Sequence, residues 1–208
     1  LLRTHGTLID EVTADALAMA GVGRVLVDLM GADAATHDWF TGVPGSFDAA
    51  CDGIRRCVAR GIAPDVLTIL TRRNAPHLNA LLQLASTLEA QRVGVLRLYP
   101  LGRAKQAWPE LALPLKEQMQ AIRALAPPAG LDVMQSWHPR DRNCCWQAAA
   151  VNAFGRAIGC MYLREYVDFG DVLERGYLDI WREDPLYRSL RAGHVEKSCP
   201  SCSSSQGS

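Results

Sequence analysis

Two runs, RVLVDL at residues 24–29 and DVLTILT at residues 65–71, decide the fold of this chain. Short runs rich in β-branched residues and leucine are typical of strands buried on both faces of a parallel sheet. Between them lies the helix-like segment 46–60, with Ser46 as its candidate N-cap and Gly61 as its candidate C-cap. The two runs therefore predict a strand–helix–strand unit.

The same alternation continues on both sides of this unit. Further strand-like runs occupy 94–98 and 131–135, and further helix-like segments occupy 10–20, 75–90 and 115–125. The segment 10–20 places Val12, Ala16, Leu17 and Ala20 on one helical face. Strands and helices that alternate at this rhythm predict repeated βα units, so we expect an α/β fold with a parallel sheet or barrel.

The pattern changes near residue 136. Residues 126–130 (APPAG) interrupt it, and the polar, irregular stretch that follows at 136–143 indicates a boundary. Beyond the boundary we expect a hairpin at 149–163 and short helical segments at 177–181 and 185–191. The predicted organisation is a βα domain at 1–138, a small cysteine-rich α+β module at 139–202 and a disordered tail at 203–208.

Composition excludes several classes of protein. The chain has 208 residues, with 22 Lys and Arg against 22 Asp and Glu. A neutral balance disfavours a protein that wraps nucleic acid, because such a protein needs a basic excess to replace counterions. No apolar run reaches the roughly 20 residues of a membrane span. The sequence opens at Leu1 without a start methionine or a signal peptide, so we expect a cytoplasmic protein whose chain begins within a longer one.

The seven cysteines are the most informative residues for function. An odd count disfavours a disulfide framework, and a chain of this length does not need one. Cys51 and Cys57 stand apart in segment 46–60, where small buried apolar side chains are expected. The other five lie in the last third of the chain, at positions 144, 145, 160, 199 and 202. Clustering of this kind predicts metal ligation.

The spacing of these cysteines predicts a four-sulfur site. Nine residues separate Cys145 from Gly155, four separate Gly155 from Cys160, and a gap of 38 leads to the C-x-x-C pair Cys199 and Cys202. A C-x-x-C turn aims two thiolates at one metal, and a hairpin can supply two more. Spacing alone leaves zinc and an iron–sulfur cluster open, and Cys144 remains an alternative to its neighbour Cys145.

The cysteine pattern as a whole resembles the SPASM or shorter twitch extension of radical S-adenosylmethionine (SAM) enzymes. The stretches GDVLE at 170–174 and LDIW at 178–181, which run into the C-x-x-C, resemble this extension as well. The resemblance implies an auxiliary [4Fe–4S] cluster held by Cys145, Cys160, Cys199 and Cys202.

The first part of the chain resembles the second half of the partial (β/α) barrel of the same family. THGTLI at 4–9 is similar to the family's TNGTLI, and HDWFTGVPGSF at 37–47 to its H-D-x-F-R-G…G-S-F. LRLYPLGR at 96–103 is similar to its r…P-x-G-r. The family's C-x-x-x-C-x-x-C, which holds the SAM-cleaving cluster, is not in this sequence and would precede Leu1.

Four strand-end residues are candidate SAM contacts by this resemblance: Asp28, Gly31, Asn74 and Pro100. Without the resemblance, Gly, Asn and Pro at such positions indicate ordinary turns. The sequence also departs from the family, with His5, Asp28, Met30 and Thr41 where it has Asn, Ser, Asp and Arg. Asp28 can still accept from ribose hydroxyls, whereas Thr41 supplies no guanidinium.

Other residues receive plainer interpretations. Arg72 and Arg73 are either solvated surface charges or contacts for an anionic substrate. The aromatic side chains Trp146, Phe154 and Trp181 are expected to pack around the small module. His5 and His37 lack a paired nucleophile, so no acid–base role and no catalytic residue is assigned.

The resemblance implies that a 5′-deoxyadenosyl radical, generated from SAM, modifies a peptide or small-molecule cofactor precursor. The implied partners are that precursor and a reductant protein, with no nucleic acid and no membrane. One alternative is a non-catalytic module in which the cysteines hold zinc or a cluster. Another is a split enzyme, whose amino-terminal barrel half comes from a second polypeptide.

Overall fold

The computed structural model describes residues 1–136, 150–158, 169–185, 187 and 188. The chain forms two compact units, one of residues 1–98 and 110–136 and one of residues 99–109 and 137–208. The tail 203–208 and most of the expected helical segment 185–191 lie outside the described residues.

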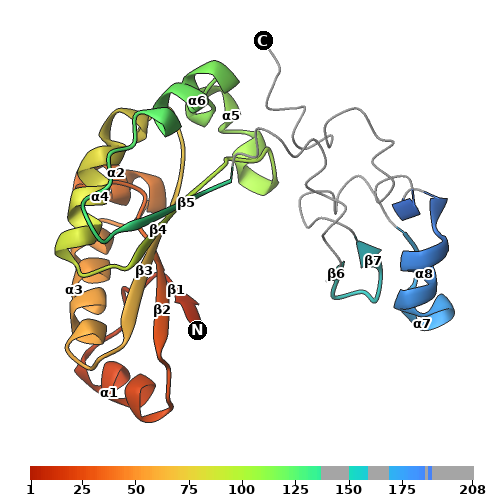
Figure 1. Cartoon of the computed structure of the whole chain (residues 1–208), viewed down its shortest axis with the longest axis horizontal. Helices are drawn as coiled ribbons and strands as arrows, with labels where there is room; N and C mark the ends of the chain where they lie inside the picture. Colours follow the sequence, from red (N-terminus) through yellow and green to blue (C-terminus); the bar gives the residue numbers. More distant parts are fainter. Residues whose placement is uncertain (137–149, 159–168, 186, 189–208) are drawn as a thin grey trace. The chain divides into compact units, whose positions relative to one another are not determined.

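The first unit contains a five-stranded parallel sheet (Figure 1). Its strands, in spatial and chain order, are β1 (Leu2–Thr4), β2 (Arg24–Asp28), β3 (Ala63–Ile69), β4 (Arg92–Leu96) and β5 (Asp132–Gln135). Each strand pairs in parallel with its neighbour, from Leu2 opposite Val25 at one edge to Arg92 opposite Asp132 at the other. This confirms the expected α/β class, because winding in one direction is how a partial barrel is built.

Helices connect successive strands. They are α1 (Glu11–Met19), α2 (Ala34–Thr41), α3 (Ser46–Val58), the 3₁₀ turn η1 (Ala75–His77), α4 (Leu78–Thr87), η2 (Gly102–Lys105), α5 (Trp108–Leu111) and α6 (Leu115–Arg123). Figure 1 shows α1, α3 and α4 along one side of the sheet. The described helices include none that is both long and apolar enough to cross a membrane.

The core lies between the sheet and these helices. Val25 and Val27 of β2 are fully buried, as is Val66 of β3. The alternate residues of β2, which are Arg24, Leu26 and Asp28, are only half-buried. Because side chains alternate along a strand, these valines form one face of the sheet. Ile54 and Cys57 of α3 are buried on the helix side. Burial raises the pKa of the Cys57 thiol, in keeping with a small apolar core residue.

The expected apolar face of α1 does not pack on the core. Ala14 is the buried residue of the helix, whereas Val12 is 75% exposed and Met19 is 89% exposed. Leu8, Val12, Ala16 and Met19 are all exposed at helical spacing, and we call them the α1 stripe.

Charges orient α1 in this way. Arg60, just beyond α3, donates from Nε to Asp15 Oδ1 at 2.6 Å and from Nη2 to Glu11 Oε2 at 2.7 Å. The side of α1 that faces α3 therefore carries its carboxylates.

The N-cap expected at Ser46 was also wrong. Gly45 is the N-cap of α3 and makes no side-chain cap bond. Asp38 of α2 supplies the acceptors instead, from the N–H groups of Gly45 at 2.6 Å and Phe47 at 2.8 Å, and from Ser46 Oγ at 2.9 Å. The H-D…G-S-F motif is thus a clamp that joins α2 to the start of α3.

The second unit contains the antiparallel hairpin of β6 (Ala150–Val151) and β7 (Ala157–Ile158), within the predicted hairpin segment. It also contains α7 (Val172–Arg175) and α8 (Tyr177–Glu183). Ala157, Phe169, Ile180 and Tyr187 form its buried cluster.

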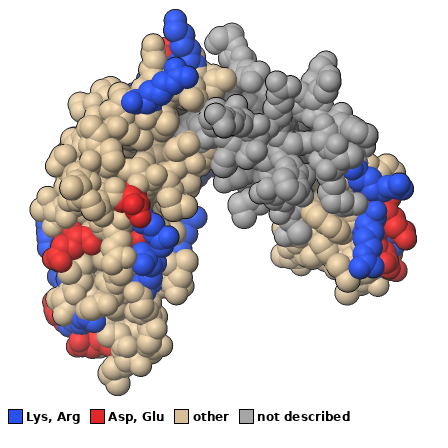
Figure 2. All heavy atoms as spheres, in the orientation of Figure 1, with Lys and Arg blue, Asp and Glu red and all other residues tan. Residues whose placement is uncertain are grey.

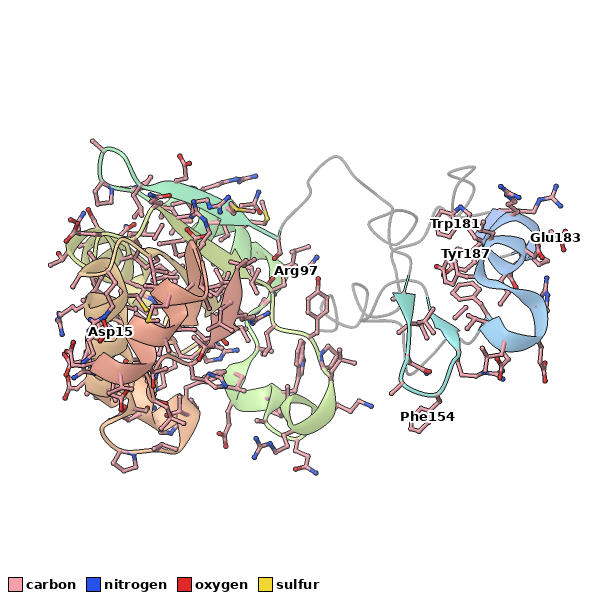
Figure 3. The ribbon with its side chains drawn as sticks, turned by 90° about the horizontal axis from the view of Figure 1, so that it is seen from below. Asp15, Arg97, Phe154, Trp181, Glu183 and Tyr187 are labelled. Atoms are coloured by element: carbon pink, nitrogen blue, oxygen red, sulfur yellow. The ribbon has the colours of Figure 1, made fainter. Side chains whose placement is uncertain are left out.

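The aromatic residues of this unit divide into two kinds. Tyr187 stacks on Phe169 at 3.8 Å and meets Trp181 at 4.7 Å between ring centroids, so the packing expected for Trp181 is confirmed (Figure 3). Phe154, at the tip of the hairpin, is 85% exposed, so the packing expected for it was wrong. The tight turn orients it outward, since Asn152 Oδ1 accepts from the N–H groups of Phe154 and Arg156. Trp146 lies outside the described residues.

Candidate functional site

The carboxyl ends of β1, β2 and β3 meet at one edge of the sheet, and we call the residues just beyond them the rim. Loops at this edge of a parallel sheet or barrel are where such folds place their ligands. Asp28, Gly31 and Asn74 all lie at the rim, next to His5 and Met30. Pro100 belongs to the residues that cluster with the second unit.

Asp28 is the rim residue that presents a polar side chain. Its Oδ1 accepts from Arg3 Nη2 at 3.1 Å, and its Oδ2 lies 3.8 Å from His5 Nδ1. The side chain of Asp28 is 14% exposed. A carboxylate has about four lone-pair sites, so Asp28 can still accept a hydrogen bond from a hydroxyl group of a ligand.

Asn74 is turned into the protein instead. Its Oδ1 accepts from the N–H of Thr71 at 2.8 Å, and its Nδ2 donates to the carbonyls of Met30 at 2.9 Å and Ile69 at 2.8 Å. The residue is 2% exposed. Asn74 therefore ties the turn after β3 to the loop after β2, and its amide is used within the chain.

Gly31 is required by close packing of the same loop. A Cβ built at this position would lie 2.4 Å from Thr36 Cβ. The loop after β2 therefore rests directly on the first turn of α2, which Asp33 caps by accepting from the N–H of Thr36 at 2.7 Å.

His37 holds the loop after β2 from the other side. The side chain is buried, and its Nδ1 accepts from the N–H of Met30 at 3.1 Å. Met30 is thus held through its N–H by His37 and through its carbonyl by Asn74. The H-D-x-F motif is visible in the sequence, but this role of His37 is not, because the group that donates to its imidazole is the backbone N–H of Met30.

Acidification should weaken the first unit through His37. Burial lowers the pKa of this imidazole from its ordinary value of 6.5, and protonation would also remove the acceptor for Met30. The unfolded chain therefore takes up the proton first, so stability from this group is complete above pH 6.5 and declines as pH falls toward the lowered pKa. We expect urea unfolding to show this loss, and His37→Asn, which keeps an acceptor without titrating, to flatten it. An equal slope below pH 6.5 in both proteins would contradict the assignment.

The two arginines after β3 have different surroundings. Arg72 Nη2 donates to the carbonyl of Ala112 at 2.8 Å, and its Nη1 lies 4.0 Å from Glu117 Oε2. Arg73 lies over the ring of Trp39, with its guanidinium carbon 4.3 Å from the ring centroid. Elsewhere on the surface, Figure 2 shows acidic and basic side chains next to one another on both units.

The four predicted cysteine ligands lie outside the described residues. The hairpin between them is described, and its register places Ala150 opposite Ile158. In the sequence, Cys145 precedes Ala150 by five residues and Cys160 follows Ile158 by two residues. Gly155 has φ +74°, a left-handed conformation suited to glycine, and closes the turn by donating its N–H to the carbonyl of Asn152 at 3.1 Å. Four thiols are the soft donors that zinc and iron–sulfur clusters take, so the donor set fits either.

Within the described ranges, no group of three or more His, Cys, Asp or Glu side chains could hold a metal ion. Cys51 and Cys57 are buried free thiols there, and burial raises the pKa of Cys51 to about 11. A thiol of that kind is a poor metal ligand, which agrees with leaving both residues out of the ligand set.

Known proteins are similar in sequence to both parts of this chain. A family model for the SPASM iron–sulfur cluster-binding domain matches residues 144–203. The AdoMet-dependent heme synthase of Methanosarcina barkeri (strain Fusaro / DSM 804) is 26% identical, over 92% of this chain and 62% of its own length. Mycofactocin maturase MftC of Mycobacterium tuberculosis (strain CDC 1551 / Oshkosh) is 28% identical, over 96% of this chain and 55% of its own. The chain thus spans less than two thirds of the length of either relative.

The fold is shared with a solved structure as well. The crystal structure of Streptococcus suis SuiB bound to S-adenosylmethionine superposes with a TM-score of 0.68, covering 91% of this chain and 49% of SuiB at 14% identity. Residues 144–203 thus match the SPASM domain, the chain is similar over most of its length to the heme synthase and to the mycofactocin maturase, and it shares its fold with SuiB.

Proposed function

We propose that this chain is the carboxyl-terminal part of a radical SAM maturase, which modifies a peptide or an organic cofactor precursor by means of a 5′-deoxyadenosyl radical. The single observation that carries the proposal is the match of the SPASM model to residues 144–203, a range that includes all four cysteines of the predicted site. The two relatives, a heme synthase and a mycofactocin maturase, support a precursor of this kind.

Cys145, Cys160, Cys199 and Cys202 would hold an auxiliary [4Fe–4S] cluster. Such a cluster supplies one-electron chemistry, with a potential set by its ligands and surroundings. Cys145 and Cys160 flank the β6–β7 hairpin in the sequence, and a reductant protein is the partner that such chemistry needs.

At the rim, Asp28 would accept a hydrogen bond from a hydroxyl group of SAM. Cleavage of SAM supplies the radical. The roles of Gly31 and Asn74 would be indirect, because Gly31 lets the loop after β2 rest on α2 and the Asn74 amide holds that loop to β3. Pro100 stays a predicted SAM contact. These groups position a ligand and shield it from water, and the radical chemistry belongs to the cofactor.

We further propose that the β1 edge and the α1 stripe bind the part of the barrel that holds the SAM-cleaving cluster. β1 is an edge strand of the described sheet, and an open parallel edge needs a neighbour. In the connection from β1 to β2, the α1 stripe exposes three large apolar side chains, with Leu8 88% accessible. A preceding βα unit would extend the sheet at β1 and cover the stripe with its helix.

A SAM-cleavage assay tests this function. The chain, reconstituted anaerobically, is combined with the part of the M. barkeri heme synthase that lies outside the matched region, SAM and dithionite, and 5′-deoxyadenosine is measured. We expect more product from the mixture than from the two parts assayed separately. Val12→Glu should remove the gain, because it places a charge in the α1 stripe. Thr13→Glu adds the same charge at an exposed position off the stripe and should retain the gain. No gain in the mixture, or equal loss in both variants, would contradict the proposal.

A further inference from the structure

Arg73 is an exposed cation beside the proposed SAM site that forms no ion pair with a carboxylate of the described residues, although its charge helps to lower the pKa of the nearby Asp33 carboxyl. Its neighbour Arg72 is engaged with Ala112 and Glu117. Arg73 contacts the ring of Trp39, and no described carboxylate forms an ion pair with it. The two adjacent arginines therefore have different roles.

The guanidinium of Arg73 is held in place from both ends. Its backbone belongs to the turn between Thr71 and Asn74, where Asn74 Oδ1 accepts from the N–H of Thr71 at 2.8 Å and from Thr71 Oγ1 at 3.1 Å. Thr71 and Asn74 are buried, so this turn has little freedom. The far end of the side chain lies on Trp39 in a cation–π contact. This contact favours one position of the guanidinium before any ligand arrives.

The pair also occupies the right place for a ligand. Arg73 follows β3 and Trp39 lies on α2, which follows β2, so the contact bridges two neighbouring loops of the rim. The Asn74 bond to the carbonyl of Met30 joins the same two loops. Trp39 remains 44% exposed, which leaves part of the indole accessible beside the cation.

The chemistry of this pair selects one kind of group. A guanidinium that contacts a ring with one face keeps its N–H groups at the edge, and these match the two oxygens of a carboxylate. We propose that Arg73, positioned by Trp39, binds a carboxylate of the substrate at the rim. The identification of the ligand as the substrate rests on the proposed function, whereas carboxylate binding itself does not.

Binding by the full chain, measured by calorimetry without SAM or reductant, tests this site. Two probe pairs are used: a short peptide with a central Glu against the same peptide with Gln, and coproporphyrin III against its tetramethyl ester. In at least one pair we expect the acid to bind about tenfold tighter than the neutral probe, the effect of one charge-assisted contact. The pair that responds identifies the source of the carboxylate.

Variants assign the effect to Arg73. Arg73→Gln should reduce binding of the acid to the level of the neutral probe, and Trp39→Ala should weaken it as well. Arg73→Lys keeps the charge without the planar fork and should fall between Arg73→Gln and the unchanged chain. Arg123→Gln removes the same charge from an exposed residue in the last turn of α6, which leads to the amino end of β5, and should leave binding unchanged.

Three results would overturn the site: neither acid binds, acid and neutral probes bind equally, or Arg123→Gln weakens binding as much as Arg73→Gln. A failed SAM-cleavage assay with intact acid binding counts against the proposed function alone. SAM cleavage without any preference for the acids counts against the Arg73 site alone.

Discussion

Replacing Gly53 with alanine should lower the free energy of unfolding of the first unit by roughly 2–3 kcal/mol, within the range of overpacked sites. A Cβ at this position would lie 2.2 Å from the carbonyl oxygen of Gly6, in the loop between β1 and α1. Because this neighbour is a backbone atom, α3 must move away from that loop. This cost exceeds the roughly 1 kcal/mol by which alanine favours a helix over glycine.

Gly23→Ala is the matched control, because nothing lies within 4 Å of a Cβ built there and its φ is not in the left-handed region. Surface substitutions of this kind change stability by about 0.5 kcal/mol or less. Urea unfolding followed by circular dichroism measures both variants. Equal stability of Gly53→Ala and Gly23→Ala would show that α3 does not approach the loop after β1 as described.

Replacing Cys199 with serine should reduce the iron bound after anaerobic reconstitution from about four atoms per chain to below about one. Serine presents a protonated, harder oxygen in place of a thiolate, so the cluster loses one of its four ligands. The visible absorption of the reconstituted protein should fall in proportion. Because structural metal sites stabilise small modules, the thermal unfolding of the second unit should also shift to lower temperature.

Cys57→Ser is the control for that experiment. Cys57 is fully buried in α3 of the other unit, so its loss should cost stability and leave the iron content unchanged. Full iron retention by Cys199→Ser would remove this residue from the ligand set. Equal iron loss in both variants would mean that the metal follows general unfolding.

The sheet could be predicted from the sequence because strands buried on one face and half-buried on the other leave continuous apolar runs. The strands β2, β3, β4 and β5 lie within two residues of the predicted runs. The outward orientation of α1 could not be predicted, because it depends on the ion pair of Arg60 with Asp15, 45 residues away. Helical spacing gives the face of a helix but not the direction in which that face points.

The rim illustrates the same limit. A strand-end position was predictable for Asn74, but its orientation depends on carbonyl groups of Met30 and Ile69, which have no side-chain signature. Asp65 is a further example, a buried carboxylate toward the amino ends of the strands. Its Oδ1 lies 2.7 Å from Arg24 Nη1, and its Oδ2 lies 3.0 Å from Arg92 Nη2. Because these charges lie on three different strands, only the register brings them together. The four cysteine ligands stay a prediction, which rests on the spacing of these residues in the sequence.

Iron, acid-labile sulfide and zinc, measured per chain after anaerobic reconstitution of the full chain, test the central claim most directly. An auxiliary [4Fe–4S] cluster held by Cys145, Cys160, Cys199 and Cys202 predicts about four irons and about four sulfides, with less than stoichiometric zinc. A colourless chain with about one tightly bound zinc and no iron would contradict it, and would favour a structural four-cysteine module instead.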